Sequence, residues 1–307
     1  MPTPASPRRL AASLSMVLWV AILPVSAAAQ APRAFTHVTP LGDVATSRSP
    51  NTGRIHVLGE LGFDTADFFR GAFDDVPQGL DEIVTGPDLA VAFELWRRER
   101  GWLRDLTLTV GTQNGIADQV QPADSLNRDW YESNNYAGLA ATLPADWRVG
   151  LTYTAYTSPD DVSPTFQELA LAVSHPAKVL GVSLEPQLKV AVPLERDPVA
   201  FQSGVYAELR VVPAFAAIPD LLTLRFPVVA GVGFDDYYGP GSGTSVFGSV
   251  GAFGAVPLKF VPASFGSWTF TAGVEVIARE DDIRRLSPFN GDDTVVAVGS
   301  VAIGFRY

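Results

Sequence analysis

The sequence predicts an all-β fold, a transmembrane up-and-down antiparallel β-barrel of about twelve strands with short turns at one end and longer loops at the other. Three observations predict it. Apolar residues recur with a period of two from Arg54 onward, which is the signature of strands. Most of these segments are about ten residues or longer, the length that a tilted strand needs to cross a bilayer. The last of them ends in an aromatic residue, Tyr307.

The N-terminus has the features of an export signal. Arg8 and Arg9 give it a positive start, an apolar stretch from Leu10 to Val25 follows, and Ala27 to Ala29 supply small residues for cleavage. The alternative is an uncleaved membrane anchor. Little periodicity follows in a segment rich in Pro, Ser, Thr and Gly. The expected organisation is a signal peptide over 1–29, a periplasmic N-terminal tail over 30–53 and an outer-membrane barrel over 54–307.

Composition narrows the classes of function. Removal of residues 1–29 takes away two Arg and no acidic residue, so the formal net charge changes from −11 to −13. A charge of that sign argues against nucleic acid as a partner. The chain has no Cys, which excludes disulfides, thiolate metal sites and Cys nucleophiles.

The final segment shows the alternation most clearly. Val301, Ile303 and Phe305 fall on one face with other apolar residues, whereas Ser300 and Arg306 fall on a mixed, polar face. The same pattern recurs along the chain. The predicted strands are 54–69, 87–97, 103–113, 134–143, 147–157, 164–174, 180–192, 200–212, 221–234, 245–258, 267–279 and 294–307.

The connections between these strands alternate in character. Short ones with Pro or Gly are predicted at 98–102, 144–146, 175–179, 213–220 and 259–266. Mostly longer, acidic ones are predicted at 70–86, 114–133, 158–163, 193–199, 235–244 and 280–293. Outer-membrane barrels have short periplasmic turns and longer outer loops, and an even strand count places both termini in the periplasm. Closure of the barrel also removes exposed strand edges. The alternative fold is a soluble β-sandwich.

Charged residues lie on the polar faces of strands whose other face is apolar. In lipid, Lys or Arg at the midplane costs roughly 2–4 kcal/mol, so we expect these side chains to point into a lumen. There they either line a water-filled path and set its selectivity, or pair across a narrow lumen and lock it. The expected lumen-lining residues are Glu60, Glu94, Arg148, Glu168, Glu185, Lys189, Glu208, Arg210, Arg225, Glu275, Arg279 and Arg306.

Aromatic residues gather near the predicted strand ends. This placement is typical of girdles at the two interfaces of a bilayer. The expected girdle residues are Trp96, Trp102, Trp130, Tyr131, Trp147, Tyr237, Tyr238 and Trp268.

Three short stretches carry family resemblances. The ending from Ala302 to Tyr307 resembles the C-terminal signature of bacterial outer-membrane proteins, which implies that Phe305 and Tyr307 form the signal for the barrel-assembly machinery. Residues 64–71, with the sequence DTADFFRG, and residues 130–139, with the sequence WYESNNYAGL, resemble TorF-type porins. That resemblance implies a small pore and supplies no catalytic residues.

Catalytic and metal-binding chemistry find little support in the sequence. The three His residues are His37, His56 and His175, and none lies in a nucleophile-elbow pattern or beside an evident Ser-acid set. Acidic pairs in the predicted outer loops, such as Asp235-Asp236 and Asp281-Asp282, lack the ordered spacing of a calcium loop. We therefore expect no enzyme, no metal site and no cofactor.

The sequence thus predicts a porin-like outer-membrane channel for passive diffusion of small polar solutes or ions through a narrow lumen. The alternative is a non-conducting outer-membrane barrel that is structural or binds a surface partner through its acidic loops. A hydrolase at the rim is the third hypothesis. Expected partners are outer-membrane lipid and lipopolysaccharide, the barrel-assembly machinery and small solutes, with no nucleic acid.

Overall fold

The computed structural model describes residues 53–73, 83–117, 130–159, 165–180, 182–194, 204–286 and 293–307. The predicted signal peptide, nearly all of the predicted N-terminal tail and parts of the predicted outer loops lie outside these ranges. Within the described ranges, no helix is long and apolar enough to cross a membrane.

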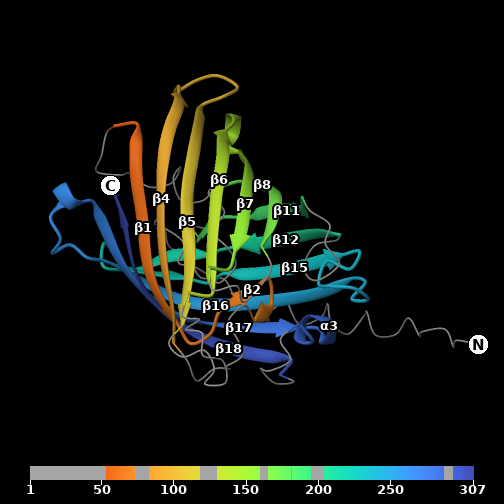
Figure 1. The fold of residues 1–307 in the computed structure, drawn as a ribbon. Coiled ribbons are helices and arrows are strands. Elements are labelled where there is room, and N and C mark those ends of the chain that lie inside the picture. Colours follow the sequence, from red (N-terminus) through yellow and green to blue (C-terminus); the bar gives the residue numbers. More distant parts are fainter. Residues whose placement is uncertain are drawn as a thin grey trace, which may run out of the picture.

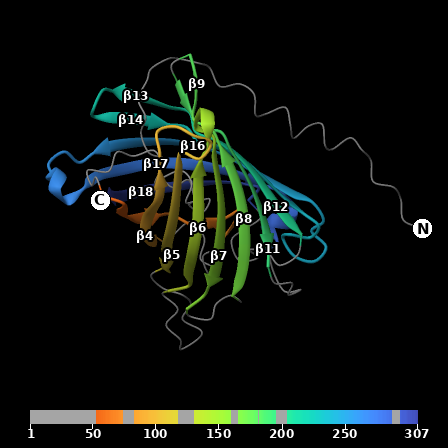
Figure 2. The same cartoon turned by 90° about the horizontal axis from the view of Figure 1, so that it is seen from above.

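One antiparallel sheet makes up almost the whole described structure, and it closes on itself (Figure 1). Each wall strand pairs with its neighbours in sequence, and the first strand, β1 (Ile55–Asp64), pairs with the last, β18 (Val295–Arg306). In Figure 2, β4 to β8 form one side of the barrel and β16 to β18 lie across from them. The other wall strands are β4 (Val84–Arg97), β5 (Asp105–Ala117), β6 (Glu132–Thr142), β7 (Arg148–Thr157), β8 (Phe166–Ser174), β11 (Gln187–Pro193), β12 (Val205–Val211), β15 (Val228–Phe234), β16 (Ser245–Pro257) and β17 (Ser267–Arg279).

The predicted fold class is therefore confirmed: the wall is a closed antiparallel barrel of twelve strands. Closure depends on ordinary backbone pairing, since Tyr307 and Val57 exchange N–H···O bonds of 2.8 Å in both directions. Phe305 stacks on Trp268 with ring centroids 5.0 Å apart and packs over Gly59, where any Cβ would overlap its ring. The ring of Phe305 thus covers the seam at which the first and last strands of the barrel meet.

At two of the predicted short turns the structure has strands instead. Residues 175–179 contain β9 (Ala177–Val179), which pairs with β10 (Val182–Leu184), and residues 213–220 contain β13 (Ala214–Ile218), which pairs with β14 (Leu222–Arg225). These pieces continue β8, β11, β12 and β15 toward the short-turn end. Proline cannot donate to a ladder, so Pro176 and Pro213 interrupt the strands and imitate turns in the sequence.

Burial alternates along the strands as the period of two predicts. In β18, Val296 and Val298 are buried whereas Val295 and Ala297 are exposed. Large apolar side chains cover the outer surface on every side of the barrel. Examples are Leu61, Leu89, Val110, Leu139, Leu151, Leu171, Leu188, Leu209, Val250, Val274 and Val301. A continuous apolar surface of this kind suits lipid and would be an association hazard in water.

The first predicted strand, 54–69, is too long. Its wall segment ends at Asp64, because Thr65 turns the chain inward and exchanges two hydrogen bonds with Gly299, each of 3.0 Å. Beyond it, β2 (Phe68–Phe69) and β3 (Ala72–Phe73) form a separate two-stranded sheet. We call residues 68–73 the inner hairpin. Gly71 abuts the ring of Phe247 in the wall strand β16, which places the inner hairpin against the wall.

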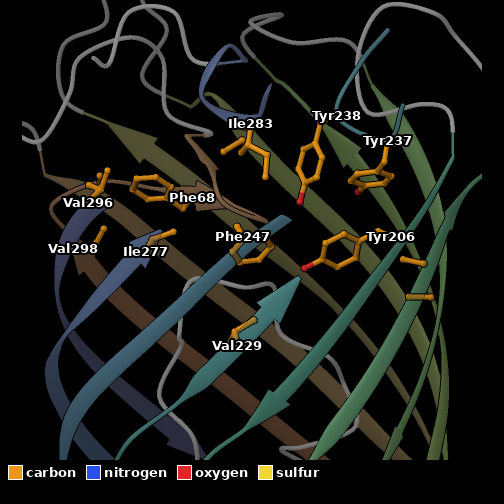
Figure 3. Packing of buried hydrophobic residues seen from close by; sticks show 14 residues of the cluster. Phe68, Tyr206, Val229, Tyr237, Tyr238, Phe247, Ile277, Ile283, Val296 and Val298 are labelled. Atoms are coloured by element: carbon orange, nitrogen blue, oxygen red, sulfur yellow. The ribbon is translucent and has the colours of Figure 1, made fainter. Parts of the chain in front are cut away.

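The aromatic girdle is only partly as predicted. Trp96, Trp102, Trp130 and Trp147 are exposed, but Tyr131, Tyr237 and Tyr238 are buried. Tyr237 and Tyr238 follow Asp235 and Asp236, which both have positive φ and turn the chain back over the barrel end. Figure 3 shows both rings near Tyr206 of β12 and Phe247 of β16, and Phe68 of the inner hairpin belongs to the same buried cluster. Ile283 of the short helix α3 (Asp281–Arg284) belongs to the same buried cluster.

Candidate functional site

The charged residues expected on the inner face are withdrawn from solvent. Eight of the twelve are buried and the other four are half-buried. Their neighbours in sequence along the strands include the exposed apolar residues of the outer surface. The buried eight are Glu94, Glu168, Lys189, Glu208, Arg225, Glu275, Arg279 and Arg306, and the half-buried four are Glu60, Arg148, Glu185 and Arg210.

The structure brings some of these charges together and gives others different partners. Lys189 of β11 lies 3.2 Å from a carboxylate oxygen of Glu208 on the neighbouring strand β12. Tyr206 donates a hydrogen bond of 2.6 Å to the same Glu208 carboxylate. Glu94 contacts His56 at 2.9 Å and also pairs with Arg97. His56 therefore has an ordinary hydrogen-bonding role, and His175 packs at a tilt against Trp147 with ring centroids 4.8 Å apart.

Glu168 of β8 has a partner that the sequence analysis did not select. Both terminal nitrogens of Arg70, in the inner hairpin, donate hydrogen bonds to the Glu168 carboxylate, at 2.5 and 2.6 Å. Arg70 is 1% exposed and Glu168 is 2% exposed, so the pair is fully withdrawn from water. A bidentate guanidinium–carboxylate pair is the strongest common form of ion pair and fixes the orientation of both groups.

The turn of the inner hairpin presents Arg70. Phe68 pairs with Phe73 and Phe69 pairs with Ala72, which leaves Arg70 and Gly71 as a two-residue turn. Both have positive φ, 53° and 84°, as a type I′ hairpin turn requires. Gly71 suits this conformation, whereas Arg70 carries the cost of a left-handed backbone and is held there by its contacts.

Aromatic rings surround the Arg70 guanidinium. Its carbon lies 4.1 Å from the centroid of Tyr206, 4.5 Å from that of Phe69 and 5.4 Å from that of Tyr237. Arg70 also donates a hydrogen bond to the hydroxyl of Tyr237. Burial lowers the pKa of Arg70, but the charge of Glu168 and the nearby tyrosine oxygens outweigh it, so the pKa is raised above its ordinary value. Arg70 is therefore permanently cationic.

Further contacts tether the inner hairpin to several parts of the barrel. Tyr238 donates a hydrogen bond of 2.9 Å to the carbonyl of Arg70, and Tyr131 donates one of 2.7 Å to Asp67, the residue directly before the inner hairpin. Phe69 packs against Tyr156 and Phe166, with centroids 5.2 and 6.2 Å away. The inner hairpin thus contacts β7, β8, β12 and the loop after β15, and it narrows the barrel interior at the end where the longer loops lie.

Arg70 could not have been selected by alternation, because it lies outside the wall strands. The available signal was Arg-Gly between two aromatic-bearing segments, the pattern of a tight hairpin turn. Within the described ranges, no group of three or more His, Asp or Glu residues is arranged to hold a metal ion.

The fold has known counterparts among solved structures. An outer membrane channel from Pseudomonas putida F1 aligns with a TM-score of 0.51 and 9% identity, over 84% of this chain and 97% of its own. The outer membrane channel DcaP of Acinetobacter baumannii aligns with a TM-score of 0.36 and 11% identity, over 82% and 96%, a score too low to add to the argument. No protein-family model and no curated protein matches the chain.

The class of fold follows from these observations. A closed barrel of twelve antiparallel strands, with apolar residues exposed and charged residues buried, has the architecture of an outer-membrane β-barrel. The narrower resemblance to TorF-type porins stays a prediction.

Proposed function

We propose that the protein is a porin-like channel of the bacterial outer membrane that passes small polar solutes or ions. The observation that carries this proposal is the difference between the two faces of one closed wall. The outer face exposes leucine and valine all around the barrel, and acids and bases from more than half of the wall strands are buried. A barrel that served only as a membrane anchor would not need so many charged groups inside.

The proposed orientation follows from the ends of the barrel. The first and last strands both have their chain ends at the short-turn end, where Tyr307 pairs with Val57. Short turns face the periplasm in outer-membrane barrels, so we place both termini there. We assign to the lumen the twelve charged residues predicted from alternation, and we expect them to influence ion selectivity. The activity proposed is passive, without catalytic residues.

A second function is favoured by one specific observation. The inner hairpin, Tyr237 and Tyr238 place buried rings in the interior at the long-loop end (Figure 3). Arg70 and Glu168 are joined there by two hydrogen bonds. This arrangement favours a non-conducting barrel with a structural or surface-binding role.

Single-channel recording separates the two functions. The full chain is purified, inserted into planar bilayers and compared with Arg70→Ala, the variant that releases the inner hairpin. A channel shows small conductance steps in the wild type or in the variant. Silence from both proteins, with insertion verified by protease protection in liposomes, would rule out the channel and leave the non-conducting barrel.

A further inference from the structure

Arg70 occupies a site that is built mostly by other parts of the chain. Tyr206 comes from β12, Tyr237 from the loop after β15, and Glu168 from β8. Only Phe69 belongs to the inner hairpin itself. We call Tyr206, Tyr237 and Glu168 the guanidinium box. If the inner hairpin moved away, these three side chains would keep their positions on the wall and its loop.

The guanidinium box suits one kind of guest. Glu168 offers two oxygens in the plane of a bidentate donor, and Tyr206 offers a ring face at 4.1 Å from the cation. A planar guanidinium satisfies both at once, because it donates two parallel hydrogen bonds and stacks on aromatic rings. An ammonium ion is a compact point charge that cannot make the paired bonds.

A neighbouring acid does not share this role. Glu208 lies on the same strand as Tyr206, but it already receives Lys189 at 3.2 Å and the Tyr206 hydroxyl at 2.6 Å. Glu168, by contrast, has Arg70 as its close cationic partner, with Tyr156 donating only a longer bond of 3.4 Å. Departure of Arg70 would therefore leave the Glu168 carboxylate buried among rings without its cation. An unpaired buried charge is strongly destabilising, so binding of another cation there would be favourable.

The inner hairpin is attached in a way that allows it to leave. Among the residues that the structure describes, its two strands pair only with each other and form a sheet separate from the barrel. Its polar tethers are side-chain contacts, such as those of Tyr238 with the Arg70 carbonyl and Arg279 with the Gly71 carbonyl at 3.5 Å. The wall ladder would remain intact without it.

We propose that the guanidinium box is a recognition site for solutes that carry a guanidinium group, and that Arg70 is its internal competitor. The inference rests on the proposed channel and names a class of solute for it. A guanidinium solute that reaches the box replaces Arg70 at Glu168 and Tyr206, and the inner hairpin is displaced. The exchange forms and breaks only ion pairs, hydrogen bonds and ring contacts.

Thermal stability in the folded, detergent-solubilised full chain tests binding without requiring conduction. Methylguanidinium chloride at millimolar concentration is the probe, and methylammonium chloride at the same concentration controls for charge and ionic strength. The proteins are wild type, Arg70→Ala and the double variant R70A/E168Q, which keeps the rings but removes the charge of the box. Unfolding is followed by the heat-dependent shift in gel mobility.

Methylguanidinium is expected to raise the Tm of Arg70→Ala by several degrees and to leave the double variant and the wild type nearly unchanged. Methylammonium is expected to have a much smaller effect on Arg70→Ala. An equal shift in all three proteins, or none in Arg70→Ala, overturns the proposal. If Arg70→Ala does not fold, Arg70→Lys is used instead, since it keeps a charge but not the paired bonds, and the same two outcomes decide.

The result is independent of the channel proposal. Stabilisation of Arg70→Ala by methylguanidinium together with electrically silent bilayers would support the site and reject the channel. Conductance without stabilisation would support the channel and reject the site.

Discussion

Glu168 and Arg70 are 98 positions apart in the chain, yet the carboxylate of one accepts two hydrogen bonds from the guanidinium of the other, both of 2.6 Å or less. This pair joins the inner hairpin to β8. It is one of several contacts that hold the segment after β1 against the wall, together with those of Tyr238 and Phe69.

Removing either partner should destabilise the barrel strongly. Arg70→Ala and Glu168→Gln each leave the other group buried without its main partner, which costs about 3–5 kcal/mol in the free energy of unfolding. The double variant should lose clearly less than the sum, because neither an unpaired carboxylate nor an unpaired guanidinium remains in it. Urea unfolding in liposomes or detergent measures all three values.

An exposed ion pair provides the control. Arg285 and Asp282 lie 2.8 Å apart, but the Arg285 side chain is 75% exposed. Arg285→Ala should change the free energy of unfolding by about 1 kcal/mol or less. Equal effects at Arg70 and Arg285 would show that the inner hairpin is not held as the structure describes.

Much of the wall could be predicted from the sequence because alternation is a local property. The burial of Val296 and Val298 follows from the period of two alone, and so does the burial of Lys189 and Glu275. A barrel wall needs only neighbouring strands to agree in register. The number of strands and the alternation of burial along them therefore followed from short segments taken one at a time.

The contents of the barrel could not be predicted in the same way. Arg70 contacts Glu168 and Tyr237, residues far away in the sequence, and no periodicity links them. Tyr237 and Tyr238 have the composition of an interface girdle, but their direction depends on the positive φ of the two residues before them. Pro176 resembles the start of a turn, and only pairing of the following residues shows that the strand resumes.

The second prediction concerns the turn of the inner hairpin. A Cβ at Gly71 would lie 2.7 Å from the ring of Phe247, and the backbone there has a φ of 84°. Gly71→Ala should therefore lower the free energy of unfolding by about 1–3 kcal/mol, because the ring must shift and the backbone is strained. It should also raise single-channel conductance if the inner hairpin narrows the path.

Gly241 is a matched control for this substitution. Its φ is 86°, but no atom lies within 4 Å of the position that a Cβ would take. Gly241→Ala keeps the backbone cost of about 1 kcal/mol and lacks the clash. Identical stability and conductance for the two variants would contradict the packing described around Gly71.

The third prediction tests the seam between the first and last strands. Gly59→Ala places a methyl group in the ring of Phe305 and should reduce the yield of folded barrel and lower its free energy of unfolding by about 1–3 kcal/mol. Gly248→Ala is the control, because its Cβ would meet only a carbonyl oxygen at 3.5 Å. The folded fraction on unheated gels measures both. A larger loss from Gly248→Ala than from Gly59→Ala would be inconsistent with the seam.

Arginine substitutions at two leucines of similar exposure test whether the outer surface faces lipid. Leu171 in β8 is 48% exposed and Leu221 at the tip of a short turn is 51% exposed. In water, arginine at either position would be tolerated equally. In a bilayer, Leu171→Arg should cost about 2–4 kcal/mol because it lies well inside the wall, whereas Leu221→Arg near the interface should cost about 0–1 kcal/mol. Unfolding in liposomes of fixed lipid composition measures the difference. Equal costs would mean that the apolar surface is covered by something other than lipid. A clear gap would place the middle of β8 in the hydrocarbon core, as expected for a strand that pairs with a neighbour on each side.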